Sequence, residues 1–379
     1  MNMNMIYIIF TNLLFFTMMQ NCESFTSNIH NKISNKLHKS RKPTSLNILN
    51  HWYVVGEDSQ VEINKPFKLT IRDTPITVWK DRTNAYSAIS DICSHRGVSL
   101  SNGRIDTSLN CVVCPYHTFK FNSCGRLIQT PGQTSVRGNQ SKFSKKTDVP
   151  YYHIIRKNNW IYMFDKPSTD LDVLPGGYDF WVEPEAYDSS FKSVDISKDF
   201  NIDARTVSEN SLDILHISEL HSFGNMMKPL PSSDKVERIG DGHIKVTYTY
   251  EAGDKSIPKV LYGINELVVE NEYVIPHYTV ARVKFGPYVN TIITSALPIS
   301  ENKTRLFVKT YRNNLITGIP VIDYFFDEIT KYLMEKTLCE DKAVVDSVYP
   351  DYKDGNFITK YDELIRTYRD DYNVYVVRE

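Results

Sequence analysis

Two short segments bring together two cysteines and two histidines that could bind metal. Cys93 and His95 form a Cys-x-His pair, and after eighteen residues Cys114 and His117 form a Cys-x-x-His pair. Thiolates and imidazoles of this kind can hold a zinc ion. In this order they can also hold a [2Fe–2S] cluster, with both cysteines on one iron and both histidines on the other. Neutral imidazoles raise the potential of such a cluster, so the pattern favours an electron-transfer centre over structural zinc.

The other cysteines do not extend this ligand set. Cys111 and Cys114 form a Cys-x-x-Cys pair, but only Cys114 has a histidine three residues downstream. Free cysteine behaves as a small apolar residue, so we expect Cys111 to be buried at the end of a strand. We expect the same of Cys124 and Cys339, and the spacing of the cysteines indicates no disulfide framework.

A second group of polar residues lies further along the chain. Asn210, Asp213 and His216 recur every three residues, so on a helix they would share one face. His221 lies five residues beyond His216, a spacing that does not share a face on a continuous helix. We therefore expect the helix to end or bend near Leu220, which would let the two imidazoles converge.

These segments resemble the catalytic subunits of the Rieske non-haem iron oxygenases. Residues 93–100 and 114–121 are similar to the two cluster loops of that family, and residues 52–56 are similar to its opening strand. The family usually has glycine and tryptophan where this chain has Thr118 and Phe119. The resemblance covers about residues 50–350, and it also includes the family pattern Asn-x-x-Asp-x-x-His-x-x-x-x-His.

The resemblance implies two metal centres. A [2Fe–2S] cluster would be held by the four residues of the two loops, Cys93, His95, Cys114 and His117. A ferrous ion would be held by His216, His221 and one carboxylate. Two histidines and one carboxylate leave positions open on the metal for O2.

In the family, this carboxylate lies on a C-terminal helix. Apolar residues at helical spacing predict such a helix within residues 320–348. It carries Glu340 and Asp341, and the family often has Glu-Asp at this point. We assign Asp341 as the iron ligand, with Glu340 and Asp346 as the alternatives.

The resemblance gives Asp213 a bridging role. In the family, the corresponding carboxylate accepts hydrogen bonds from its own iron-binding histidine and from a cluster histidine of the neighbouring subunit. Here these would be His216 and His117 of the partner subunit. Asp213 and Asn210 are therefore our catalytic candidates. Because the useful cluster would belong to the neighbour, we expect a closed ring of identical subunits, a homotrimer.

The implied activity is oxygenation. Electrons from NAD(P)H would arrive through a ferredoxin or reductase, and O2 would be used to hydroxylate or oxidatively demethylate a small organic or pigment substrate. The alternative is a Rieske electron carrier or a START-like binding protein without oxygenase activity. The formal net charge of −1 gives no indication of nucleic-acid binding.

The expected fold class is α+β with two domains. Short strands separated by turn residues predict an all-β Rieske domain at residues 50–166, and residues 167–177 look like its boundary. Residues 178–379 would form a helix-grip (START-like) catalytic domain, with an antiparallel sheet and a long C-terminal helix. The predicted strands are 67–71, 76–80, 153–156, 160–164, 244–250, 273–285, 291–296 and 305–311.

The first 45 residues have the composition of a targeting presequence. Residues 5–19 are nearly all apolar, a length typical of a signal-peptide core and short for a spanning helix. A basic, acid-poor stretch follows, which resembles the bipartite plastid presequence of algae with complex plastids. The alternatives are a secretory signal or membrane anchor, and targeting to another organelle.

Overall fold

The computed structural model describes residues 51–132, 145–168, 181–221, 230–254 and 257–376. The predicted presequence and the region of the domain boundary beyond residue 168 therefore lie outside the described residues. No helix among the described residues is long and apolar enough to span a bilayer.

The first half is built from three small antiparallel sheets. One joins β1 (Trp52–Glu57), β11 (Trp160–Phe164) and β10 (Ile154–Lys157). The next joins β2 (Phe67–Ile71), β3 (Thr74–Lys80), β4 (Tyr86–Ser90) and β9 (Tyr151–Tyr152). The last joins β5 (Arg104–Asp106), β6 (Cys111–Val113), β7 (Lys120–Asn122) and β8 (Leu127–Gln129). The predicted all-β character and the strands at 67–71 and 160–164 are confirmed.

The second half is one antiparallel sheet in the order β12-β18-β17-β16-β15-β14-β13. These strands are β12 (Lys192–Phe200), β13 (Ser233–Gly240), β14 (His243–Glu251), β15 (Glu266–Val274), β16 (Tyr278–Phe285), β17 (Tyr288–Ser300) and β18 (Lys303–Arg312). Burial alternates along β14 as the sequence predicted, because one face of the sheet is covered and the other is more open.

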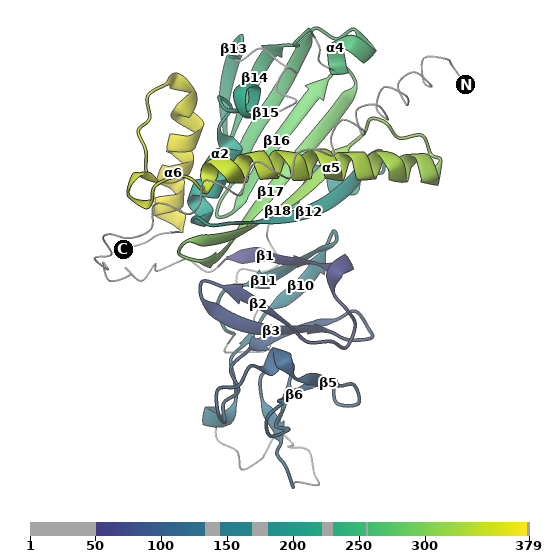
Figure 1. The fold of residues 1–379 in the computed structure, drawn as a ribbon, viewed down its shortest axis with the longest axis vertical. Helices are drawn as coiled ribbons and strands as arrows, with labels where there is room; N and C mark the ends of the chain where they lie inside the picture. Colours follow the sequence, from purple (N-terminus) through teal and green to yellow (C-terminus); the bar gives the residue numbers. More distant parts are fainter. Residues whose placement is uncertain (1–50, 133–144, 169–180, 222–229, 255–256, 377–379) are drawn as a thin grey trace, which may run out of the picture. The chain divides into compact units, whose positions relative to one another are not determined.

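A long helix, α5 (Pro320–Val345), lies across one face of this sheet (Figure 1). Leu338 and Val345 of the helix pack against Phe200, Leu306 and Val308 of the strands. The predicted arrangement, an α+β fold with an all-β part followed by a sheet and a long C-terminal helix, is confirmed.

Two predictions about elements of the second half are wrong. Residues 273–285 are not one strand, because a turn with a cis Ile275–Pro276 peptide bond separates β15 from β16. A further helix, α6 (Glu363–Tyr375), was not expected in the polar C-terminal segment. Its Leu364 and Tyr368 are buried against residues of β14 and β15.

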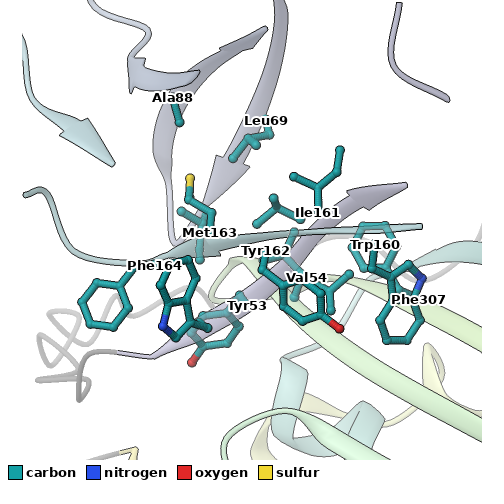
Figure 2. Packing of buried hydrophobic residues seen from close by; sticks show 14 of the residues in the cluster. Tyr53, Val54, Leu69, Ala88, Trp160, Ile161, Tyr162, Met163, Phe164 and Phe307 are labelled. Atoms are coloured by element: carbon teal, nitrogen blue, oxygen red, sulfur yellow. The ribbon is translucent and has the colours of Figure 1, made fainter. Parts of the chain in front are cut away.

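The described residues belong to one compact unit, and its largest apolar cluster joins the two halves. Strands β1 and β11 of the first half contribute Tyr53, Val54 and Tyr162 to this cluster, which also includes Phe307 of β18 (Figure 2). Figure 1 shows β5 and β6 at the far end of this unit from α5, with β1, β10 and β11 between them.

Candidate metal centres

The first cluster loop is a tight turn that follows β4. The Cys93 N–H donates to Val98 O (3.0 Å), and the Gly97 N–H donates back to Cys93 O (2.8 Å). Gly97 has a φ of 71°, which glycine adopts without the steric cost that a side chain would bring. The turn therefore presents Cys93 and His95 on one short, internally bonded loop.

The second loop repeats this design between β6 and β7. The Cys114 N–H donates to Phe119 O (2.8 Å), and the Thr118 N–H donates to Cys114 O (3.1 Å). Thr118 has a φ of 57°, a conformation that β-branched residues rarely adopt. The position where the family usually has glycine therefore keeps the backbone that glycine favours.

The two loops meet with their thiols inside and their imidazoles outside. Cys93 and Cys114 are only 3% and 1% exposed, whereas His95 is exposed and His117 is half-buried. The two imidazole ring centroids are 4.7 Å apart, and His95 stacks on Phe119 at 4.6 Å. Burial raises the pKa of Cys93, and the neighbouring Cys114 thiol contributes to the rise. Two adjoining buried thiols behind two outward imidazoles fit a cluster with cysteines on the inner iron and histidines on the outer one.

The buried carboxylate of Asp91 stabilises the first loop through hydrogen bonds. It accepts hydrogen bonds from Thr77 Oγ1 (2.6 Å), the Ser101 N–H (2.7 Å) and the Ser99 hydroxyl. Burial alone would raise the pKa of Asp91, but these donors outweigh burial, so the pKa lies below its usual range. The carboxylate therefore links Ser99 and Ser101, which follow the turn, to Thr77 in β3, which precedes it.

The burial of the remaining cysteines agrees only partly with the prediction. Cys111 is fully buried in β6, as predicted. Cys124 is half-buried, and Cys339 is exposed on α5, where the Lys198 ammonium donates to its sulfur (3.2 Å). The expected burial of Cys339 is wrong because the sulfur lies at the edge of the helix face that packs on the sheet.

The second candidate centre begins with a helix that ends earlier than predicted. The helix α2 (Ala204–Leu212) stops before Asp213, whose backbone is extended at φ −72° and ψ 123°. The Asp213 carboxylate accepts from the Leu215 N–H (2.8 Å), a local bond that competes with helix continuation. The expected shared helix face of Asn210, Asp213 and His216 is therefore wrong.

A short helix, α3 (Ile217–Leu220), then separates the two histidines. His216 is its N-cap and His221 its C-cap, so the predicted helix end at Leu220 is observed. The two imidazole ring centroids lie 5.1 Å apart. The spacing of five residues brings the rings together because a helix boundary lies at each of them.

Asp341 of α5 completes a convergent group. Its Oδ1 lies 3.5 Å from His216 Nε2 and 3.6 Å from His221 Nε2. One ligand atom from each of the three residues lies within 4.8 Å of the other two. Asp341 Oδ1 is buried and has no hydrogen-bond partner among the described residues, which fits an oxygen that faces a cation.

The other two carboxylates proposed for this role are engaged elsewhere. Glu340 Oε2 lies 3.2 Å from His221 Nδ1, on the side of the ring away from Asp341. Asp346 accepts from the Asn201 N–H (2.8 Å) and pairs with Lys342. The structure therefore brings Asp341, and not Asp346, to the two imidazoles, while Glu340 contacts one of them from behind.

Carboxylates also flank His216 on both sides. Asp213 Oδ2 lies 3.5 Å from Nδ1, while Asp341 faces Nε2. Burial disfavours the charged imidazole, but Asp213 and Asp341 outweigh burial and raise the pKa of His216 to about 9. An environment that favours positive charge, between the buried Asp341 and the half-buried Asp213, also fits a bound metal cation.

Asn210 is half-buried in the last turn of α2, where its carbonyl accepts from the Asp213 N–H (3.2 Å). Its catalytic role stays a prediction. The contact that sequence reasoning missed is the one between Glu340 and His221. An imidazole that binds a metal through one nitrogen has a second nitrogen that needs a partner. The position of Glu340 next to Asp341 in the sequence could therefore have suggested this contact.

Comparison with known families identifies the first half. The Rieske [2Fe–2S] domain model matches residues 51–143. The iron–sulfur subunit TsaM1 of the toluene-4-sulfonate monooxygenase system of Comamonas testosteroni is 25% identical over 55% of this chain and 57% of its own length. Pheophorbide a oxygenase of Oryza sativa subsp. japonica, a chloroplastic protein, is 25% identical over 71% of this chain and 50% of its own length. The chain thus spans between half and three fifths of these curated relatives.

The fold has close counterparts among solved structures. Dicamba monooxygenase bound to dicamba matches with a TM-score of 0.70 at 18% identity, over 86% of this chain and 96% of that one. The oxygenase component of dicamba O-demethylase from Stenotrophomonas maltophilia is also 24% identical in sequence over 58% of this chain and 61% of its own length. Residues 51–143 are thus a Rieske [2Fe–2S] domain, and the chain as a whole has the fold of dicamba monooxygenase and is similar in sequence to subunits of Rieske-type oxygenases.

Proposed function

We propose that this chain is a Rieske-type oxygenase that hydroxylates or oxidatively demethylates a small organic or pigment substrate. The observation that carries the proposal is the convergence of His216, His221 and Asp341 within 4.8 Å, in a chain that also has the two cluster loops. A Rieske electron carrier would need the loops alone. Two centres in one chain support coupling of electron transfer to oxygen chemistry.

In this proposal each ligand set has a distinct task. Cys93, His95, Cys114 and His117 hold the [2Fe–2S] cluster, and His216, His221 and Asp341 hold Fe2+. The cluster would supply one-electron transfer, and the iron would supply activation of O2 for attack on a carbon bond of the substrate. The two Nε2 atoms and Asp341 Oδ1, which lies 3.5 and 3.6 Å from them, would be the donor atoms. Asp213 keeps the Nδ1 side of His216 next to a negative charge.

We also propose that electrons pass between subunits of a homotrimer. A ferredoxin or reductase would reduce the cluster, and Asp213 would connect His216 to His117 of the partner subunit. The distribution of elements in Figure 1 supports this route, because β6 and the adjoining cluster loop lie at the far end of the unit from α5. A head-to-tail ring would bring a neighbour's cluster to each iron site.

The cellular setting is part of the proposal. Several relatives are named as chloroplastic, among them pheophorbide a oxygenase and the chlorophyllide a oxygenase of Chlamydomonas reinhardtii. We propose a plastid enzyme in which residues 1–45 are a targeting presequence. Residues 50–166 would be the Rieske domain and residues 178–379 the catalytic domain.

The test is to measure metal content and oxygen incorporation together. The purified chain should contain acid-labile sulfide and one iron beyond the cluster, and its reduced form should give a Rieske spectrum. With NADPH, ferredoxin and ferredoxin reductase, 18O from 18O2 should appear in a product formed from extracts of plastid-bearing cells. His117→Ala should lose the cluster spectrum and keep the additional metal, whereas His216→Ala should do the reverse. A protein with zinc and no sulfide would refute the proposal.

A further inference from the structure

The side of His221 away from Asp341 is occupied by a second acidic residue of α5. His221 Nδ1 lies 3.2 Å from Glu340 Oε2, and His221 Nε2 lies 3.6 Å from Asp341 Oδ1. Two successive residues of one helix therefore face the two nitrogens of a single imidazole ring. The His221 side chain is 5% exposed and that of Glu340 is 21% exposed, so solvent reaches this contact poorly.

This contact determines which ring nitrogen carries the proton. An ionised carboxylate can only accept hydrogen bonds, so the Nδ1 atom of His221 must donate to Glu340. In a neutral imidazole the other nitrogen, Nε2, then has a free lone pair. That lone pair points toward Asp341, where the proposed metal would be held.

His221 lies at the end of a helix and not inside a regular element. It caps α3, a helix of only four residues, and its backbone is already extended at φ −80° and ψ 132°. His216 also has a carboxylate on this side of its ring, but a more distant one, since Asp213 Oδ2 lies 3.5 Å from Nδ1. Each histidine of the site therefore has one carboxylate at Nδ1 and shares Asp341 at Nε2.

We propose that Glu340 is a positioning residue that orients His221 and fixes its Nδ1–H tautomer for metal binding. This role rests on the proposed function, because it requires that His216, His221 and Asp341 hold a metal. It differs from a ligand role, in which a Glu340 oxygen would bind the metal directly. Partners of this kind typically change metal affinity by about 10–100-fold when they are removed from a histidine ligand.

The experiment measures Co2+ binding to the cluster-loaded chain, after removal of the mononuclear metal, by the visible absorption of the bound ion. Glu340→Ala should weaken Co2+ binding by about 10–100-fold and alter the absorption bands, because the His221 ring can rotate. Glu340→Gln retains an acceptor oxygen and should recover much of the affinity. Glu335→Ala changes an exposed glutamate of the same helix and should bind Co2+ like the wild type.

The melting temperature and the cluster absorption of each variant separate positioning from folding. A positioning role predicts that both stay near wild type in Glu340→Ala while Co2+ affinity falls. Wild-type Co2+ affinity in Glu340→Ala, or a loss as complete as that of Asp341→Ala, would overturn the proposal. If His216→Ala does not change Co2+ binding to the otherwise native chain, the proposed function itself fails, and the role of Glu340 fails with it.

Discussion

At the scale of single residues, Thr118 is the most unusual position of the cluster loops. It has a φ of 57°, close to the φ of 71° at Gly97 in the first loop. Its N–H still donates to Cys114 O (3.1 Å), so the hydrogen bond that closes the turn is made despite the strain. A β-branched side chain in this region indicates that the surrounding turn imposes the conformation on the residue.

Thr118→Gly should therefore stabilise the loop. Removing Cβ relieves roughly 1–2 kcal/mol of left-handed strain, while the greater freedom of glycine in the unfolded chain costs roughly 0.5–1 kcal/mol. The net gain in unfolding free energy should therefore lie between about 0 and 1.5 kcal/mol. Thermal unfolding monitored by the cluster absorption should show a higher midpoint for Thr118→Gly. Thr118→Val keeps the β-branch and should show no gain, and an equal gain in both variants would contradict this explanation.

At the scale of elements, the end of β4 controls the first cluster loop through Asp91. Its carboxylate accepts from Thr77 of β3, and from Ser99 and Ser101 beyond the loop. The strand, the loop and the residues that follow are therefore connected through one buried negative charge. Hydrogen bonds to charged groups contribute roughly 1.5–3 kcal/mol each, so this connection is stronger than the turn bonds alone.

Asp91→Asn should destabilise the metal-free chain by roughly 2 kcal/mol near neutral pH. Because folding lowers the pKa of Asp91, its stabilising contribution is present above the unfolded pKa of about 3.9 and is lost as the pH falls through the folded value. The difference between wild type and variant should therefore narrow below about pH 4. Urea unfolding at several pH values measures this difference. Glu62→Gln, at an exposed glutamate, should show little difference from wild type at any pH.

The helices show which parts of the fold could be predicted from sequence. The helix α5 was predicted because its apolar residues recur at helical spacing over many turns, and β14 because its alternation is regular. The break at Asp213 could not be predicted from periodicity, since it depends on a hydrogen bond from Leu215 that competes with the helix. The helix α6 carries Leu364, Tyr368 and Tyr372 at a spacing of four, a signal that its polar composition obscured.

The residues of the candidate site also differ in how far they could be predicted from sequence. Metal-ligating types at short spacing, such as Cys114 and His117, could be predicted because both partners lie in one turn. The distant carboxylate Asp341 required the family pattern, and the neighbouring position of Glu340 beside His221 required three-dimensional structure. Sequence separation therefore limited prediction more than residue type did.

At the scale of the whole molecule, buried polar contacts hold the two halves in one unit. His277 Nε2 donates to Trp52 O (2.6 Å), and the Ser295 hydroxyl donates to His277 Nδ1 (2.8 Å). Burial lowers the pKa of His277 to about 3, which keeps the ring neutral and suits this pair of bonds. Lys309 of the large sheet also donates to Asn158 O (2.6 Å) in the turn before β11. These contacts hold the half that carries the cluster loops against the sheet of the half that carries the proposed iron site.

A chain that begins at Thr44 should fold and load both centres. The first described strand begins at Trp52, and every proposed metal ligand lies beyond residue 90. The shortened chain should match the full chain in iron, sulfide and melting temperature. Loss of cluster loading in the shortened chain would show that the proposed presequence contributes to the folded enzyme.

The proposed route between subunits predicts that two inactive chains restore each other. His117→Ala removes a cluster ligand and His216→Ala removes an iron ligand, so each variant alone should be inactive in product formation. In a ring of mixed subunits, an intact cluster of the His216→Ala chain can face an intact iron site of the His117→Ala chain. Co-expression of both chains should therefore recover measurable turnover, whereas mixing the separately purified variants without subunit exchange should not.

Two further combinations make this test decisive. A chain that carries both substitutions should restore nothing when co-expressed with Asp213→Asn, because no pairing then combines an intact cluster, bridge and iron. Asp213→Asn should complement the His117→Ala chain, which supplies an intact bridge and iron site, but should fail with the His216→Ala chain. The asymmetry arises because Asp213 lies 3.5 Å from His216 of its own chain and must act on that iron site. Recovery with neither partner would place the electron route within one chain, and equal recovery with both would contradict the bridging role of Asp213.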